Sequence, residues 1–422
     1  MIEDLLQRIK RASFYTLHQR SLRANQKWQD SAIQRLVFHV GQTVPFWTTI
    51  FKKEGTDMTS INTRSDLTRL PITNKETYRQ HYIDHYLDNS RPIFSPWRTT
   101  SGSTGEPFTF QLGYSRLDPQ YDDFARLRFL LWRNVLLSKL SRVAPARIKI
   151  TPESRANGLY ISMSEFRGNP TGSIKRINAF KPDILESYAS ILLDISNRVA
   201  KNNIRIPYAI SYGEMLTSAA RSHVEQVFDC EVYDRYGVEE VGVIATECAR
   251  HNGMHVHCES MFVEIVDHED GPVSNGGRGR VIVTDLLNYN MPFIRYDTGD
   301  YGRLSHETCA CGLQTPRLWI EGRHGASISL YGRKIHHLEF AAAMERFSGL
   351  IRQYQIAKTN ESALQIRIVP ATPFNGPILT DIAHEIQLLV GEHALVEATI
   401  VSSVHALPSG KSQTLVDESI PR

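Results

Sequence analysis

The sequence has few of the features that mark secreted, membrane-spanning or nucleic-acid-binding proteins. Only five of its 422 residues are cysteine, too few for a disulfide scaffold. No apolar run approaches the roughly eighteen residues of a transmembrane helix, and the acidic pair Glu3-Asp4 argues against a secretory signal. The net charge of +3 comes from scattered residues and gives no electrostatic basis for binding nucleic acid. We therefore expect a cytoplasmic protein with neither a membrane nor a nucleic-acid partner.

The length and the hydrophobic pattern predict a mixed α/β protein of more than one domain, because 422 residues exceed one ordinary core. Apolar residues at helical spacing predict a helix over 28–40, ended by Gly41. Short strands are expected around 232–233, 261–266 and 281–283, and a strand, a helix and a strand between 364 and 401. We expect a large N-terminal domain of mixed β-sheets and helices over 1–322 and a small, mobile α+β domain over 323–422.

The stretch Thr-Thr-Ser-Gly-Ser-Thr-Gly-Glu-Pro at 99–107 is too rich in hydroxyls and glycine to build a core. Glycines let backbone amides approach an anion, and the hydroxyls add donors, so the stretch could hold a phosphate. A solvated turn is the alternative interpretation. Phe108 and Phe110 alternate with polar residues, which predicts a strand leaving the loop. The loop has no lysine of its own, so a phosphate site would need a cation from elsewhere in the chain.

Further segments turn this loop into a functional hypothesis. They are Ser-Tyr-Gly-Glu at 211–214, Tyr-Gly-Val-Glu-Glu at 236–240, Arg-Tyr-Asp-Thr-Gly-Asp at 295–300 and Pro-Ser-Gly-Lys at 408–411, with landmarks at 44–47, 70–73 and 181–185. As a set they resemble the adenylate-forming superfamily, in its subfamily of phenylacetate-CoA ligases, coenzyme F390 synthetases and capsule-biosynthesis proteins. The resemblance implies that ATP activates a carboxylic acid as an acyl adenylate, with Mg²⁺ as cofactor.

The resemblance also implies roles for individual residues. Lys411 and Glu240 would be catalytic, Lys411 at the carboxylate and α-phosphate and Glu240 as the magnesium ligand. Asp300 would hold the ribose hydroxyls, Arg323 would support the ribose or a phosphate, and Tyr236 would stack on adenine. The residues expected to bind ATP or AMP are Thr100, Ser101, Gly102, Ser103, Thr104, Gly105, Gly213, Glu214, Tyr236, Gly237, Asp300 and Arg323.

Two departures from the family pattern concern this site and the expected hinge at 323–326. Glu239 stands where relatives carry Ser or Thr. We expect its side chain to point into solvent, and the alternative is that it changes metal binding. Gly325 and Ala326 replace the Asp or Lys that relatives carry after the arginine. Domain rotation about this hinge is implied for the second half-reaction. The segment 331–335 matches the family segment that faces the active site for thioester formation, and its basic pair could receive a CoA phosphate; a solvated pair is the alternative interpretation.

Cysteines and a histidine predict a structural Zn²⁺ site at Cys248, His255, Cys309 and Cys311. Three thiols and an imidazole from two separated loops are suitable ligands for tetrahedral zinc, and the resemblance supports the same set. His251, His257 and Cys258 lie close by in sequence, so the identity of the histidine is open. Unpaired buried thiols are the alternative interpretation.

The leading functional hypothesis is an ATP-dependent ligase for an aryl or related small acid, with CoA as acceptor. Candidates for the acid pocket are Tyr121, Phe124, Tyr188 and Tyr212, and a place in the hydrophobic core is the alternative interpretation of these aromatic residues. The alternative is a ligase that delivers the acid to an amine, a hydroxyl or a carrier protein without CoA. A catalytically inactive adenylate-binding protein is the third hypothesis. The acid, the acceptor and the oligomeric state, including a homodimer, are left open by the sequence.

Overall fold

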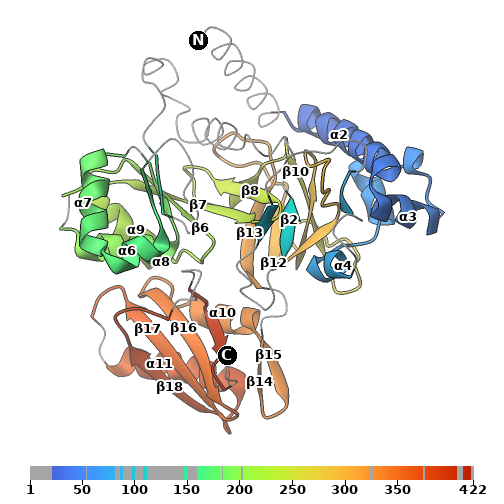
Figure 1. Ribbon diagram of the computed structural model, residues 1–422. Helices are drawn as coiled ribbons and strands as arrows, with labels where there is room; N and C mark the ends of the chain where they lie inside the picture. The colour runs from blue at the N-terminus through green and yellow to red at the C-terminus, as the bar shows by residue number, and fades with distance from the viewer. Residues whose placement is uncertain are drawn as a thin grey trace. The chain divides into compact units, whose positions relative to one another are not determined.

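The computed structural model describes residues 21–53, 55–80, 86–88, 97–99, 108–111, 147–150, 159–182, 184–200, 203–323, 327–373, 376–405 and 412–419. The chain divides into two compact units, the first made of Met1–Leu140 and Arg235–Ile320 and the second of Ser141–Asp234 and Glu321–Arg422. Both units combine helices with strands, and the predicted mixed α/β class is confirmed (Figure 1). Within the described ranges, no helix has the length and apolar character needed to cross a membrane.

The first unit begins with helices that follow one another closely in sequence. They are α2 (Leu22–Thr43), α3 (Pro45–Lys53), the 3-10 turns η1 (Met58–Ser60) and η2 (Arg64–Arg69), and the short α4 (Lys75–Arg79). The helix expected over 28–40 lies within α2, but the predicted end at Gly41 is wrong, because α2 continues to Thr43. It ends at Val44 instead, which is extended (φ −105°, ψ 112°). Pro45 opens α3 and disfavours a helical conformation in the residue before it.

A sheet forms the centre of the first unit, with strand order β10-β11-β12-β13-β9-β8-β7. The pairs β10–β11, β11–β12, β13–β9, β9–β8 and β8–β7 are antiparallel. The strands are β7 (Glu231–Val238), β8 (Gly242–Glu247), β9 (Met254–Val256), β10 (Met261–Val266), β11 (Arg278–Asp285), β12 (Tyr296–Ser305) and β13 (Arg317–Arg323). The strands expected around 261–266 and 281–283 correspond to β10 and β11. Alternate residues of β12 are buried, so Tyr296, Thr298 and Asp300 share one face.

A short hairpin flanks the hydroxyl-rich loop. β1 (Trp97–Thr99) pairs antiparallel with β2 (Thr109–Gln111), with Thr99 opposite Thr109. Phe108 and Phe110 are buried in the core of the first unit, as their alternation predicted, whereas Thr109 is exposed. The hairpin therefore fixes both ends of the loop, while residues 100–107 themselves lie outside the described part of the chain.

The second unit contains four strands in the order β6-β5-β3-β4, all of which pair in parallel. These strands are β3 (Arg147–Ile150), β4 (Leu159–Ile161), β5 (Ile184–Ser187) and β6 (Tyr208–Tyr212). The helices α6 (Met163–Gly168), α7 (Pro170–Phe180), α8 (Ala189–Arg198) and α9 (Ser218–Phe228) contribute apolar side chains to a core shared with the strands. Ligands commonly bind at the carboxyl ends of parallel strands. Tyr188 directly follows β5, and Tyr212 is the last residue of β6.

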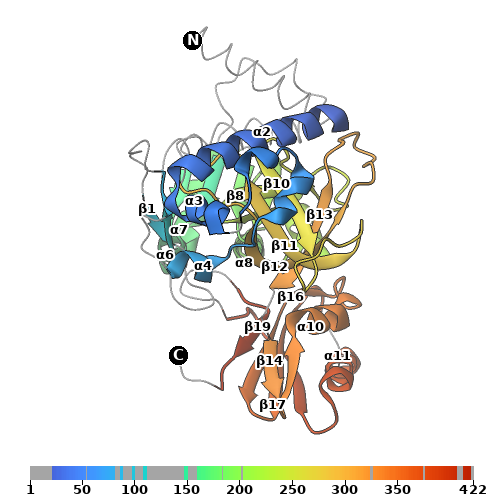
Figure 2. The same cartoon turned by 90° about the vertical axis from the view of Figure 1, so that its right-hand side faces the viewer.

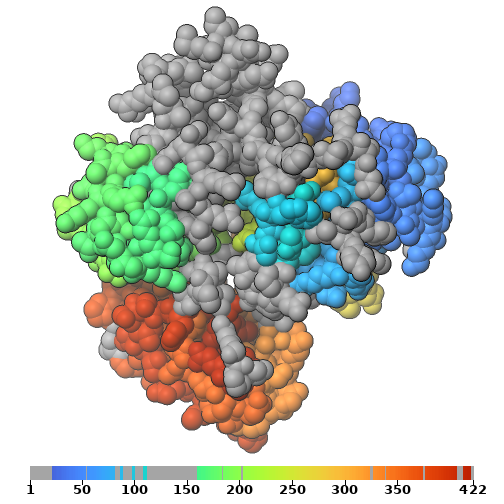
Figure 3. Space-filling view, viewed as in Figure 1, coloured from blue at the N-terminus to red at the C-terminus, as the bar shows by residue number. Residues whose placement is uncertain are grey.

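The C-terminal part of the second unit has a core of its own. Its elements are the hairpin β14 (Ser327–Leu330) and β15 (Arg333–His336), α10 (His337–Glu345), α11 (Gly376–Val390) and a sheet. In that sheet, β18 (Leu395–Ile400), β17 (Ala363–Pro370), β16 (Ile351–Asn360) and β19 (Leu415–Asp417) lie in this order, and α10 and α11 pack against them (Figure 2). The strand, helix and strand expected between 364 and 401 are β17, α11 and β18, coloured orange to red in Figure 3.

Ile366 gives a test of this C-terminal core. It is fully buried on β17 among side chains of α10 and α11, so Ile366→Ala should remove buried methyl groups and leave a cavity. We expect a loss of about 2–5 kcal/mol in the free energy of unfolding, measured by urea denaturation followed by tryptophan fluorescence and circular dichroism. Leu395→Ala on β18 is the matched control, because Leu395 is 70% exposed and should change stability by less than about 0.5 kcal/mol. Equal losses in both variants would contradict the described core.

Candidate active site and metal centre

The candidate active site of the first unit begins with the segment before α4, which is held along the start of β12. The backbone N–H of Thr73 donates to the Arg295 carbonyl at 2.9 Å, and the N–H of Asp297 donates to the Thr73 carbonyl at 2.7 Å. The Arg295 guanidinium donates to the Leu70 carbonyl at 2.7 Å and pairs with Glu264 at 3.3 Å. This backbone pairing fixes the chain two residues before Lys75, the first residue of α4.

Glu240 forms an ion pair with Lys75. The Lys75 Nζ is 2.7 Å from Glu240 Oε1, and the Glu240 side chain is 2% exposed. The Tyr296 hydroxyl donates to the same oxygen at 3.3 Å. Burial, followed by the nearby Glu240 carboxylate, raises the pKa of Tyr296 well above its usual value, so Tyr296 acts as a neutral donor. Glu239, by contrast, is exposed, in agreement with the sequence-based expectation.

Asp300 forms the second carboxylate position of the site. Its side chain is buried on β12, and the Tyr236 hydroxyl on β7 donates to Asp300 Oδ2 at 2.7 Å. Gly237 is the next residue of β7, and the register of the β7–β8 pairing shifts between Tyr236 and Gly237. A Cβ at Gly237 would lie 2.5 Å from the Gly242 carbonyl oxygen, so only glycine allows this close backbone approach. The structure thus brings together Tyr236 and Asp300, which the sequence predicted separately.

The other expected binding residues fall into two groups. Gly213, Glu214, Tyr188, Tyr212 and Arg323 lie in the second unit, where the rings of Tyr188 and Tyr212 meet edge to face with centroids 5.1 Å apart. Gly213 adopts a positive φ of 72°, a conformation that favours glycine. The expected residues outside the described part of the chain are Thr100, Ser101, Gly102, Ser103, Thr104, Gly105, Tyr121, Phe124 and Lys411.

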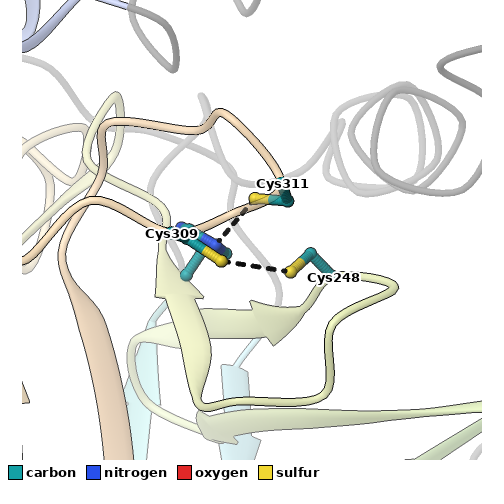
Figure 4. A group of neighbouring side chains, drawn as sticks. Cys248, Cys309 and Cys311 are labelled. Atoms are coloured by element: carbon teal, nitrogen blue, oxygen red, sulfur yellow. Dashed lines mark hydrogen bonds between the residues drawn. The ribbon is translucent and has the colours of Figure 1, made fainter.

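Cys248, His255, Cys309 and Cys311 form a compact group in the first unit, with ligand atoms all within 4.8 Å of one another. Cys248 follows β8, His255 lies on β9, and the Cys309-Cys311 turn connects β12 to β13. The Cys248 and Cys309 sulfurs are 3.9 Å apart, and Cys311 Sγ is 3.3 Å from His255 Nε2 (Figure 4). This donor set could hold a metal ion.

Hydrogen bonds around the group favour metal binding. The hydrogen bond between Cys248 and Cys311 lowers the pKa of Cys311, with a further contribution from His255, and raises the pKa of Cys248, so Cys311 is the thiolate of this pair. The N–H of Leu313 donates to the Cys311 sulfur at 3.5 Å. A thiolate is the form of cysteine that ligates metals. His255 Nδ1 lies 3.2 Å from the Thr315 carbonyl, to which it can donate, so that Nε2 presents its lone pair to the cysteines.

The structure also separates His255 from the neighbouring histidines and identifies residues that the sequence missed. His251 pairs with Glu247 at 3.1 Å, and His257 bonds to Thr246 at 3.0 Å, so neither joins the metal-binding group. Lys75 was not predicted, although it follows the landmark at 70–73. Tyr296 was quoted only as part of a motif. Both residues contact Glu240, and sequence spacing does not reveal these contacts.

Comparisons with known proteins agree with this arrangement. No family model matches the sequence. Phenylacetate-coenzyme A ligase of Thermus thermophilus is 26% identical over 377 residues, which cover 85% of this chain and 84% of that protein. Protein CapK of Staphylococcus aureus is 24% identical over 295 residues, covering 66% of this chain and 63% of that protein. A solved 2-hydroxyisobutyryl-CoA ligase in the postadenylation state superimposes with a TM-score of 0.75 at 19% identity, covering 95% and 91% of the two chains.

The fold is that of the adenylate-forming enzymes. At 19% identity the solved ligase supports the fold alone, so the assignment to a group within the superfamily rests on the sequence relatives. They support placing the chain in the phenylacetate-CoA ligase-like group of the adenylate-forming superfamily. The resemblance drawn from the motifs is thereby confirmed.

The contact between Lys75 and Glu240 gives a test of the site as described. Lys75→Met leaves the buried Glu240 carboxylate without its ammonium partner, which should cost about 2 kcal/mol or more in unfolding free energy. Combining Lys75→Met with Glu240→Gln should recover part of this loss, since no buried charge is then left unpaired. Urea denaturation of the two single variants and the double variant measures the coupling energy. Strict additivity would contradict the pairing, and Glu239→Gln, at the exposed neighbour, is the control.

Proposed function

We propose that the protein is an adenylate-forming ligase that activates a small carboxylic acid with ATP and transfers the acyl group to CoA. In the first half-reaction the acid carboxylate attacks the α-phosphorus of ATP, forming an acyl adenylate and releasing pyrophosphate. In the second, the CoA thiol attacks the acyl carbon, forming a thioester and releasing AMP. The observation that carries the proposal is that the first unit holds two buried carboxylates with partners, Glu240 with Lys75 and Asp300 with Tyr236, in a chain whose relatives are named phenylacetate-CoA ligases.

The two buried carboxylates suit separate tasks. Asp300 can accept hydrogen bonds from adjacent ribose hydroxyls, and the Tyr236 hydroxyl at 2.7 Å orients that carboxylate. Glu240 offers hard oxygen ligands to Mg²⁺, which would neutralise the charge on the phosphates. Lys75 adds a positive charge at the same carboxylate and could turn to a phosphate oxygen when Glu240 binds another cation.

The remaining roles come from the family resemblance. We propose that residues 1–322 bind ATP and the acid, that the loop at 100–105 holds the leaving pyrophosphate, and that 323–422 carries the catalytic Lys411. The hairpin of β1 and β2 supports the loop's role, because it closes the loop at both ends. Arg323, Gly213 and Glu214 were expected at the ribose and the adenine, and the contacts of Glu214 lead to a different role below. The cytoplasm, where ATP and CoA are available, is the proposed compartment.

An aryl acid is the proposed substrate class, on the basis of the relatives' names and the aromatic pair Tyr188 and Tyr212. CapK is also a relative, and its name does not include CoA. Transfer to an amine, a hydroxyl or a carrier protein is therefore the second candidate function. Only transfer to CoA consumes CoA as the adenylate is used, so a measurement of CoA consumption distinguishes the two functions.

Exchange of labelled pyrophosphate into ATP, tested with a panel of aryl, indolyl and aliphatic acids, examines the first half-reaction directly. Lys411→Ala should keep the fold and lower acid-dependent exchange by at least about a hundredfold, since it removes a cation from the developing charge. Lys52→Ala is the control, because Lys52 is an exposed lysine on α3 outside the proposed site. Undiminished exchange in Lys411→Ala would refute the catalytic lysine, and no exchange by the wild-type protein with any acid would refute the ligase.

We also propose that Cys248, His255, Cys309 and Cys311 hold a structural Zn²⁺. Three thiols and one imidazole are the ligands that zinc prefers, and four protein ligands complete a tetrahedral site without an open position for catalysis. The buried position of Cys248, His255 and Cys309 supports a role in folding. The other two cysteines, Cys230 and Cys258, are not part of this group.

Metal analysis of the purified protein tests this site. We expect close to one zinc per chain in the wild-type protein and in Cys230→Ser, whose cysteine lies in the second unit. Cys309→Ser should lose most of the zinc and lower the thermal midpoint, because it removes one of the four ligands. Absence of zinc from the wild-type protein purified without chelators, or full zinc content in Cys309→Ser, would contradict the proposal.

A further inference from the structure

The Glu214 carboxylate is held by the amino-terminal end of α8. Its Oε2 accepts the backbone N–H of Ser190 at 2.8 Å, and its Oε1 accepts the Ser190 hydroxyl at 3.0 Å. Ser190 is the second residue of α8, so its N–H is one of those left unpaired in the first helical turn. A carboxylate at this end of a helix is favoured by the helix dipole. Both oxygens of Glu214 are therefore fixed in position by one residue.

The same carboxylate also accepts a hydrogen bond from the backbone N–H of Ser412. Ser412 follows Lys411 directly in the sequence, and it belongs to the same compact unit as Glu214. The backbone of Thr414 is fixed as well, because its carbonyl accepts the Ile356 N–H at 2.8 Å. Its hydroxyl lies 2.5 Å from Nε2 of His337, which is only 7% exposed. Among these contacts, the one from Glu214 lies nearest to Lys411 along the chain.

A second contact in the same unit shows that Glu214 is not alone in joining these segments. Thr217 caps α9, and its hydroxyl lies 3.0 Å from the Ile351 carbonyl and 2.9 Å from the Arg352 carbonyl of β16. The Arg352 guanidinium in turn donates to Asn197 at 3.1 Å. These contacts do not involve Glu214. A variant at Glu214 should therefore release the Ser412 peptide without separating the rest of the unit.

We propose that Glu214 is a positioning residue for adenylation, acting through the Ser412 peptide to hold the backbone next to Lys411. This inference rests on the proposed function, which gives Lys411 its role at the carboxylate and the α-phosphate. A lysine side chain has four rotatable bonds, so a mobile backbone beneath it would spread the ammonium over many positions. Fixing the adjacent peptide group reduces that spread before the substrates arrive.

Hydrogen exchange tests the structural half of the inference without any need for activity. In Glu214→Ala, we expect faster backbone exchange in a peptide covering 412–417, with unchanged exchange in one covering β17. Glu214→Gln should lie between Ala and the wild type, because its amide oxygen still accepts but carries no charge. Glu225→Gln is the matched control, since Glu225 accepts the Val232 N–H at 3.2 Å in the same unit. Unchanged exchange at 412–417 in Glu214→Ala would overturn the inference.

Comparing the rates of the two half-reactions tests whether Glu214 contributes to adenylation. Glu214→Ala should lower acid-dependent pyrophosphate exchange about tenfold or more, with Glu214→Gln less affected, while transfer of a supplied acyl adenylate to CoA should fall several-fold less than the exchange does. A general folding defect would lower both rates. Equal losses in the two half-reactions, or no loss of exchange, would overturn the positioning role. No exchange by the wild-type protein with any acid would instead refute the proposed function, while the hydrogen-exchange result would still decide whether Glu214 holds the Ser412 peptide.

Discussion

Backbone hydrogen bonds between Thr73 and the start of β12 determine where the two charged side chains of the candidate active site meet. Lys75 follows Thr73 at the start of α4, so its ammonium group has a fixed approach to Glu240 at 2.7 Å. Without this pairing, a 2% exposed carboxylate would lack a countercharge, and burying such a charge alone is costly. The segment that begins α4 thus supplies the positive charge that stabilises the buried Glu240 carboxylate.

A common design links Glu240 and Asp300. Each carboxylate is buried, and each accepts a hydrogen bond from a tyrosine hydroxyl, from Tyr296 in one case and Tyr236 in the other. Tyrosine donors orient a carboxylate without neutralising it, so the oxygens keep the charge that a metal ion or a ribose would use. Glu214 follows a different pattern, because its partners are a helix end and a backbone N–H. These partners place Glu214 where it can hold the backbone at Ser412.

Sequence reasoning succeeded where local pattern or ligand chemistry dominates. The alternation at 363–370, the apolar stripe of α11 and the cysteine-histidine set all carry their information in the residues themselves. It failed at Gly41, where the weak helix-breaking tendency of glycine lost to the packing of α2, with Gly41 against Met58 and Phe51. Neither the role of Lys75 nor the contact between Glu214 and Ser412 could be predicted from the sequence, because both depend on pairing between distant segments. The same limit applies to Thr315, whose carbonyl orients His255.

The metal-binding group has a consequence for how the chain is produced. Its cysteines at 248 and 309 are 61 residues apart, and the strands between them include β9, β10, β11 and β12. A metal ion bound there would cross-link this stretch much as a disulfide does, but reversibly and without an oxidant. The yield of mature protein would then follow the metal supply of the producing cell, and chains made under metal starvation would be exposed to proteolysis before the sheet is complete.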